Sequence, residues 1–303
     1  MNSERPPTPA PAVGSCVWCN AAISADAWVG FRRLRCSRCG AETTFPFPDE
    51  AELDAAYGGA YRPVSGRFSG PGDVLLRHGR GRLASRLDQI APPGPILDVG
   101  AGDGALLKSL QAEGRVAVGT ERSPAGSETG TGREGGGAWA GVVFWHSLEH
   151  LADAGRRVDA LPAALLPNGI VVIAMPNPRS LQARAFGDRW LALDLPRHLV
   201  QVPADALLGR LSEVGLKVER VSYLRGGQVV FGWLHGLVGM LPGHPSLYDA
   251  IRRHEARSAP LGGIQRVVAL ALAAALLPIA TALAIVEAAT KRGGTVYVEA
   301  RRA

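Results

Sequence analysis

The sequence predicts an α/β fold built on a doubly wound, mostly parallel sheet. The first observation is residues 95–104, P-I-L-D-V-G-A-G-D-G, where a short apolar strand runs into a glycine loop and then into a helix-forming stretch. The second is a pair of apolar runs, residues 139–146 and 170–175, typical of strands buried on both faces. Strand, glycine loop and helix in this order favour a nucleotide-binding crevice, because glycines let backbone N–H groups approach a ligand closely.

Size and composition indicate a folded chain of one or two domains. The 303 residues are 47% hydrophobic with a mean hydropathy of +0.07, which excludes a disordered protein. The net charge of +6 comes almost entirely from arginine, which we interpret as compositional bias. No basic run has interleaved aromatic residues, so we do not expect nucleic acid as a partner.

The N-terminal part predicts a small metal-binding module. Residues 1–14 are rich in proline and lack an apolar core, so we expect a disordered arm without a secretory signal. In residues 15–45, two C-x2-C pairs are separated by sixteen residues, which predicts a zinc ribbon rather than disulfides. Its four thiolates are those of Cys16, Cys19, Cys36 and Cys39.

Four thiolates close a tetrahedral zinc site, so the ribbon is expected to be structural and not catalytic. The alternative is four unrelated buried cysteines. Trp28, Phe31 and Leu34 are expected to pack a miniature core, which is too small to stand without metal.

Residues 46–94 are predicted to be a linker with packing helices. A short helix is expected at 50–57, and a Gly-, Pro- and Ser-rich linker at 62–72. The arginine-rich stretch 73–90 predicts a helix that packs on the main domain and is interrupted near residues 79–81.

Residues 95–225 carry the predicted α/β core. After the glycine loop, we expect a second strand at 115–121, a helix ending at 160–166, a turn at 167–169, a helix at 203–213 and a strand at 215–223. The stretch 123–137 is of low complexity, so the third strand is expected to be abbreviated. Glu121 lies at the end of the second strand, where an acidic side chain accepts hydrogen bonds from ribose hydroxyls.

Five segments together resemble one enzyme family: I-L-D-V-G-A-G-D-G, the acidic Glu121, F-W-H-S-L-E-H-L, L-P-N-G-I-V-V-I-A-M-P-N-P and L-P-R-H-L. The chain resembles class I S-adenosylmethionine-dependent methyltransferases, and in particular bacterial members with an N-terminal zinc ribbon. The resemblance covers residues 16–223 and the final strand. It implies a Rossmann-like methyltransferase fold with S-adenosylmethionine as cofactor.

The resemblance also implies roles for particular residues. The methionine and ribose side of the cofactor would be lined by Asp98, Gly100, Ala101, Gly102 and Gly104. Glu121 would hold the ribose hydroxyls, and Trp145 and His146 would border the sulfonium and the substrate. Family members usually have a further helix and strand that supply an adenine-binding acid, and here residues 123–137 stand in their place.

The candidates for a catalytic base are His146, Glu149, His150 and His198. Methyl transfer needs a base only when the acceptor carries a proton of high pKa, and His146 is the first candidate. The spacing of His146 and His150 also occurs in metal sites, but no third ligand is evident, so no metal is expected there. Alternatively, Glu149 and His150 brace a helix, and His198 satisfies a loop carbonyl.

Residues 226–290 predict an apolar helical insertion before the last strand of the core, at 291–303. Residues 267–286 form an uncharged run of twenty residues, and 229–241 is a shorter apolar stretch. We expect a helical hairpin that either lies in a membrane interface or forms a soluble lid over the active site.

The expected function is methyl transfer to a small-molecule or lipid-linked acceptor. We expect a cytoplasmic protein; the membrane-interface alternative for the insertion would associate it with the inner face of the membrane, with a membrane surface as a partner. One alternative is an RNA methyltransferase that uses the zinc ribbon, although no N-P-P-aromatic motif follows the fourth strand. Another is a non-catalytic scaffold with a degenerate cofactor pocket.

Overall fold

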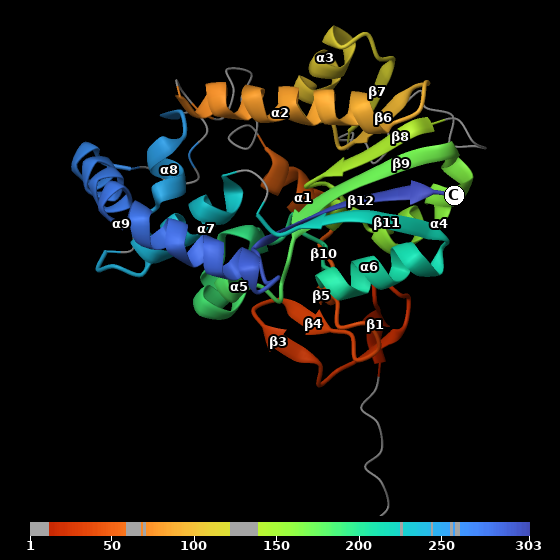
Figure 1. Cartoon of the computed structure of the whole chain (residues 1–303). Coiled ribbons are helices and arrows are strands. Elements are labelled where there is room, and N and C mark those ends of the chain that lie inside the picture. The colour runs from red at the N-terminus through yellow and green to blue at the C-terminus, as the bar shows by residue number, and fades with distance from the viewer. Residues whose placement is uncertain are drawn as a thin grey trace, which may run out of the picture.

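The central sheet has six strands within the described residues, in the order β11, β12, β9, β8, β6, β7 (Figure 1). The strands are β6 (Ile96–Val99), β7 (Ala117–Thr120), β8 (Trp139–Trp145), β9 (Leu165–Pro176), β11 (Leu216–Ser222) and β12 (Thr295–Arg302). Strands β7, β6, β8 and β9 pair in parallel, whereas β12 is antiparallel to both β9 and β11. The predicted doubly wound, mostly parallel fold is confirmed.

The structure is a computed structural model that describes residues 12–58, 68, 71–121, 139–224, 227–243, 245–254, 257 and 261–303. Most of the predicted arm and linker, and all of the low-complexity stretch 123–137, therefore lie outside the described residues. Residues 12–14 of the predicted arm belong to strand β1 (Ala12–Ser15), which pairs with β2 (Ala22–Ser24).

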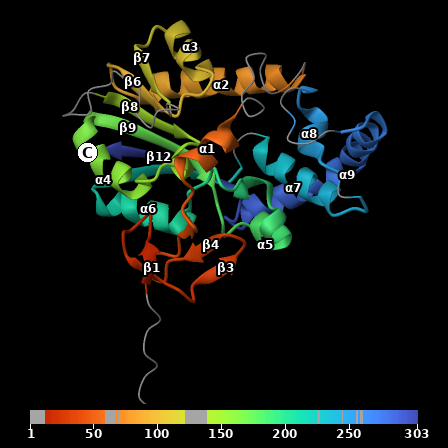
Figure 2. The ribbon, with the colours of Figure 1, turned by 180° about the vertical axis from the view of Figure 1, so that it is seen from behind.

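Helices cover both faces of the sheet (Figures 1 and 2). Helices α2 (Pro71–Ile90) and α3 (Ala105–Ala112) lie on one face, and α4 (Ala154–Ala164) and α6 (Ala204–Glu213) on the other. Side chains alternate along β8, so Val143 packs with the leucines of α2 and α3, and Val142 and Phe144 pack with those of α4 and α6. This double burial explains the unbroken apolar run of β8.

Two predicted boundaries were wrong. Helix α2 continues through Gly79 and Gly81 without a break, because the buried Leu83 and Leu87 anchor its second half. Packing of those leucines outweighs the roughly 1 kcal/mol that each glycine costs in a helix. The predicted turn at 167–169 lies inside β9, where a bulge separates the pairs Trp139–Leu165 and Gly141–Ile170.

The cysteine-containing module shares a sheet with the core. Its strands β3 (Trp28–Gly30), β4 (Arg33–Arg35) and β5 (Glu42–Thr44) are extended by β10 (Val200–Gln201), which comes from the α/β domain. Trp28 and Phe31 are 51% and 66% exposed, so the expected miniature core is wrong for these two residues. Instead Trp18 and Ile23 join Leu34 in a core that is continuous with the main domain.

The C-terminal insertion consists of α7 (Gln228–Gly239), α8 (Leu247–Ile251) and α9 (Gly263–Ala289), placed between β11 and β12. Figure 2 shows it beyond one end of the sheet, next to α5 (Leu181–Phe186). A small core at its base joins it to the segment after α5: Phe186, Trp190, Leu193, Val229, Trp233, Ala280 and Ala284. Helix α1 (Glu50–Tyr57) follows the cysteine module.

Candidate active site

The glycine loop after β6 is held between the ends of β7 and β8. Gly100, Gly102 and Gly104 have φ angles of +78°, +67° and +69°, the left-handed region that favours glycine. The N–H groups of Gly100 and Ala101 both donate to the Thr120 carbonyl at 2.9 Å. The strand order reverses at β6, so the loop lies at the switch point where open α/β sheets bind ligands.

Two carboxylates flank this loop. Asp98 is 3% exposed, and burial raises its pKa to about 6, opposed by the charge of Arg80 and reinforced by Glu121 and Asp103. Glu121 follows β7, and its carboxylate accepts a hydrogen bond from the Gly102 N–H. Left-handed glycines and an acid near the end of each strand fit the methionine and ribose parts of S-adenosylmethionine.

Arg80 is a site residue that the sequence did not single out. Its guanidinium carbon lies 5.3 Å from the ring centroid of Trp145, at the end of β8. The ring of Trp145 also contacts Tyr297 of β12, with centroids 6.2 Å apart. Helix α2 therefore brings a positive charge to the edge of the sheet where the glycine loop ends. The arginine-rich pattern of the predicted packing helix was the available signal.

His146 has an unusual backbone conformation. Its φ angle is +54°, which costs a non-glycine residue about 1–2 kcal/mol and is often found at functional sites. The His146 N–H donates to the Ala174 carbonyl at 2.7 Å, and its Nδ1 lies 3.5 Å from Glu149 Oε1. Its buried Nε2 has no hydrogen-bond partner within the described residues.

The three predicted histidines converge on Glu149. The rings of His150 and His198 are 4.6 Å apart, edge to face, and His198 Nε2 lies 3.9 Å from Glu149 Oε1. Burial, followed by the charge of His198, lowers the pKa of His150 to about 4, so its imidazole is neutral. Burial opposes ionisation of Glu149, but the surrounding histidines hold the pKa of its carboxyl below the ordinary value.

The cysteine module supports this histidine cluster directly. Thr44 of β5 donates its hydroxyl to the His198 carbonyl at 2.6 Å, and its N–H donates to the Leu199 carbonyl at 3.0 Å. The Leu199 N–H donates in turn to the Glu149 carbonyl at 2.8 Å. The two Thr44 contacts join positions more than 100 residues apart, so sequence spacing could not reveal them.

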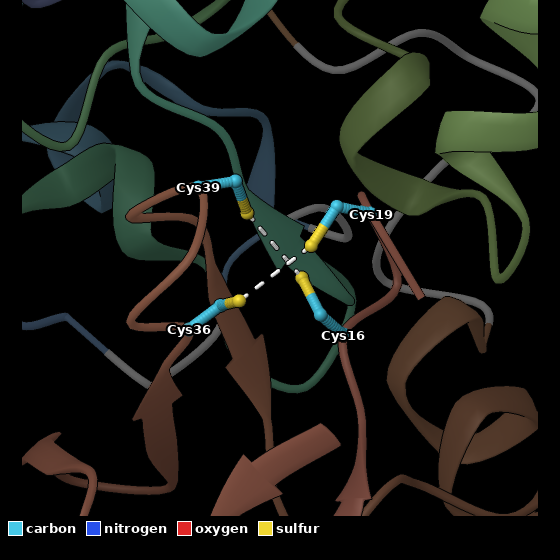
Figure 3. Close-up of side chains that lie close together, drawn as sticks. All are labelled: Cys16, Cys19, Cys36 and Cys39. Atoms are coloured by element: carbon cyan, nitrogen blue, oxygen red, sulfur yellow. Dashed lines mark hydrogen bonds between the residues drawn. The ribbon is translucent and has the colours of Figure 1, made fainter. Parts of the chain in front are cut away.

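The four cysteines face one another (Figure 3). The Sγ atoms of Cys16 and Cys39, and those of Cys19 and Cys36, are each 3.6 Å apart, and all four thiols are free. A tetrahedral site with Zn–S bonds of about 2.3 Å has sulfur–sulfur edges of about 3.8 Å. The arrangement is therefore compatible with structural zinc.

A family model described as a methyltransferase domain matches residues 75–221, from within α2 almost to the end of β11. The chain therefore contains a methyltransferase domain. With its glycine loop at the switch point of a doubly wound sheet, the protein is a class I S-adenosylmethionine-dependent methyltransferase.

Solved structures of similar fold include several methyltransferases. A putative sarcosine dimethylglycine methyltransferase from Galdieria sulphuraria is 12% identical, with a TM-score of 0.45, covering 84% of this chain and 98% of that one. A SAM-dependent methyltransferase from Archaeoglobus fulgidus is 16% identical, with a TM-score of 0.42 and coverages of 73% and 94%. The [4+2]-cyclase SpnF is 17% identical, with a TM-score of 0.45 and coverages of 85% and 98%. No curated protein matches the sequence.

Proposed function

We propose that this enzyme methylates a lipid-linked acceptor at the inner surface of a membrane. The cofactor, when bound, supplies a methyl group activated by a positively charged sulfur. The residues that would hold it are Asp98, Glu121 and the glycine loop from Gly100 through Ala101 and Gly102 to Gly104. Trp145 and His146 would border its sulfur on the side of the acceptor. The closely packed glycine loop, between two strand-end carboxylates, supports this assignment.

His146 is our candidate for the base that accepts the proton of the acceptor. Its Nε2 makes no hydrogen bond within the described residues, so that nitrogen can take up a proton. The Glu149 carboxylate, 3.5 Å from Nδ1, would stabilise the resulting imidazolium. His150 and His198 lie deeper, with Nδ1 atoms near backbone carbonyls, and we propose that they position Glu149.

The single observation that favours a lipid-linked acceptor is the exposed apolar surface of α9. This 27-residue helix is long and apolar enough to cross a membrane by length and composition. Ile264, Val267, Ile279 and Ile285 are between 51% and 82% exposed. Since β11 and β12 are paired in one sheet, both ends of the insertion lie on the same side of any membrane, which favours insertion into one leaflet.

The base of the insertion is connected to the histidine cluster. Trp190 and Leu193 pack against α7 and α9, and the same segment continues through Asp194 to His198. An acceptor whose lipid tail lies in the membrane beside α9 would therefore have its polar head near the sheet edge that carries His146.

Two measurements test the proposal. His146→Ala should lower turnover at least a hundredfold while the affinity for S-adenosylmethionine, measured by calorimetry, changes little; unchanged turnover would exclude His146 as the base. Methyl label from the cofactor should enter the organic phase of a membrane lipid extract. Label found only in water-soluble products would exclude the lipid-linked acceptor while leaving methyl transfer intact.

The membrane contact has its own control. Wild-type protein should float with vesicles of phosphatidylcholine and phosphatidylglycerol, and the double variant Ile279→Gln, Ile285→Gln should not. Val116→Gln alters an equally exposed apolar residue (67%) outside the insertion and should float like wild type. Wild-type protein that stays in solution would contradict the membrane contact.

A further inference from the structure

Glu149 is a buried carboxylate surrounded by histidines. It is 0% exposed, and neither carboxylate oxygen has a hydrogen-bond partner among the described residues. Leaving a carboxylate buried in this way costs several kcal/mol. The nearest potential partners are histidine nitrogens at 3.5 and 3.9 Å, too distant for good hydrogen bonds. The surrounding histidines favour the ionised carboxylate, and a bound cation would give its oxygens the direct partner that they lack.

The two inner histidines are oriented as metal ligands are. His150 Nδ1 lies 2.9 Å from the Arg197 carbonyl, and His198 Nδ1 lies 2.9 Å from the Ala192 carbonyl. Tyr57 Oη, which can donate or accept, also lies 2.9 Å from His150 Nδ1, and Gln201 Nε2 lies 3.3 Å from His198 Nδ1. Because a carbonyl oxygen only accepts and the amide contact is the longer one, we assign the proton of each neutral ring to Nδ1, which leaves a lone pair on Nε2. Metal-binding histidines show this same arrangement, with the second nitrogen donating to a carbonyl or carboxylate.

The spacing of the donors suits one ion. Donor atoms from Glu149, His150 and His198 all lie within 4.8 Å of one another. A tetrahedral ion with bonds of about 2.0–2.1 Å has ligand–ligand edges of about 3.3 Å, so a small inward movement would complete the site. The side chains of His146 and His198 remain 21% and 8% exposed, so the cluster is not sealed from solvent.

We propose that Glu149, His150 and His198 bind a divalent first-row transition-metal ion, separate from the metal of the four cysteines. Two imidazole nitrogens and one carboxylate suit zinc, manganese, iron or cobalt better than magnesium or calcium. His146, whose Nδ1 is 3.5 Å from Glu149 Oε1, is the nearest further donor. The ion neutralises Glu149 and fixes the loop of His198 against the segment that follows β8. This inference does not depend on the methyl acceptor.

Cobalt distinguishes the two sites, because only thiolate ligands give strong sulfur-to-metal charge-transfer absorption. Titration of the metal-free full-length protein with Co²⁺ should show two equivalents bound per chain. One should carry the thiolate bands of the cysteine site, and the other only the weak bands of nitrogen and oxygen ligands. Binding of a single equivalent, accounted for entirely by the thiolate bands, would overturn the proposal.

Variants locate the second equivalent. Glu149→Gln and His198→Gln should each lose it and keep the thiolate bands, which also report that the cysteine module is folded. His235→Gln changes a partly buried histidine of α7 outside the cluster and should retain both equivalents. A second equivalent that persists in both cluster variants would place the metal elsewhere and refute the assignment. If either variant fails to fold, the wild-type stoichiometry still decides.

Discussion

The backbone of Gly100 packs so closely on Ser147 that a Cβ atom at Gly100 would lie 2.6 Å from the Ser147 Cβ. Real Cβ contacts essentially never come this close. The loop after β6 and the segment after β8 are therefore in direct contact, and the cofactor loop and His146 share one rigid unit.

Gly100→Ala should separate these two segments and weaken S-adenosylmethionine binding at least tenfold. Gly104→Ala is the matched control, because Gly104 has a similar φ of +69° but its Cβ would meet only Leu107, at 4.0 Å. Both variants should lose about 1–2 kcal/mol of stability from left-handed strain, measured by urea unfolding. Equal affinities of the two variants in calorimetry would contradict the steric explanation.

Asp98 should make stability and cofactor affinity depend on pH. Its native pKa of about 6 lies above the unfolded value near 4, so between these pH values the native state holds more protons than the unfolded state. The free energy of unfolding should therefore fall as pH rises from 4 to 6, by up to about 3 kcal/mol for this group. Asp98→Asn should lack that slope, so its stability relative to wild type should increase over the same range.

Bound S-adenosylmethionine should favour the ionised form of Asp98 over the protonated form. A cationic ligand favours the ionised Asp98 carboxylate, so the affinity of wild type should fall up to about tenfold per pH unit below pH 6. Calorimetry from pH 5 to 8 on wild type and Asp98→Asn checks this, since the variant should bind weakly and without that dependence. Parallel pH profiles for the two proteins would exclude Asp98 as the titrating group.

Loss of the cysteine metal should impair the distant histidine cluster. Chelation should disorder β5, release the His198 segment and lower turnover together with the melting temperature. Thr44→Val separates the two effects, because it removes the 2.6 Å hydrogen bond to the His198 carbonyl while leaving all four cysteines in place. We expect a loss of about 1–3 kcal/mol and reduced turnover with full zinc content, measured by elemental analysis. Normal turnover in Thr44→Val would show that the module acts without this contact.

Glu287 should hold the insertion to the core. This carboxylate of α9 is 0% exposed and accepts hydrogen bonds from the Gln182 N–H, Gln182 Nε2 and Trp233 Nε1 at 2.8–2.9 Å. Glu287→Ala leaves these donors unpaired and should cost about 2–4 kcal/mol. The fluorescence of Trp233 should shift toward that of an exposed indole, and Thr281→Ala, on the exposed side of α9, should leave it unchanged.

The core of this fold can be predicted well from the sequence, because strands buried on both faces appear as continuous apolar runs. Strands β8 and β9 are apolar at nearly every position, and the glycine loop after β6 has turn chemistry that few other structures require. The helix break predicted near Gly79 failed because packing outweighs local preference in α2. At Asn168 the local preference is kept, with a left-handed φ of +61°, but as a bulge inside β9 and not as a turn that separates two elements.

The residues of the candidate site also fall into two groups, those that local sequence predicts and those that only tertiary contacts bring together. Asp98 and Glu121 follow from local position in the chain, at the ends of adjacent strands. Glu149 and His198 are brought together by tertiary contacts that include β5 of the cysteine module. The position of Arg80 beside Trp145 depends on which side of α2 faces the sheet. The spacing of His146 and His150 is one found in metal sites, but the donors that converge are Glu149, His150 and His198. His198 lies 48 residues beyond His150 and is close to it only in the folded chain.

The position of β12 constrains how the chain is made. This strand fills the gap between β9 and β11, yet it is synthesised only after the whole insertion α7–α9. Until then β9 and β11 each present an unpaired edge to solvent. The exposed apolar surface of the insertion therefore exists in the nascent chain before the sheet beneath it can close.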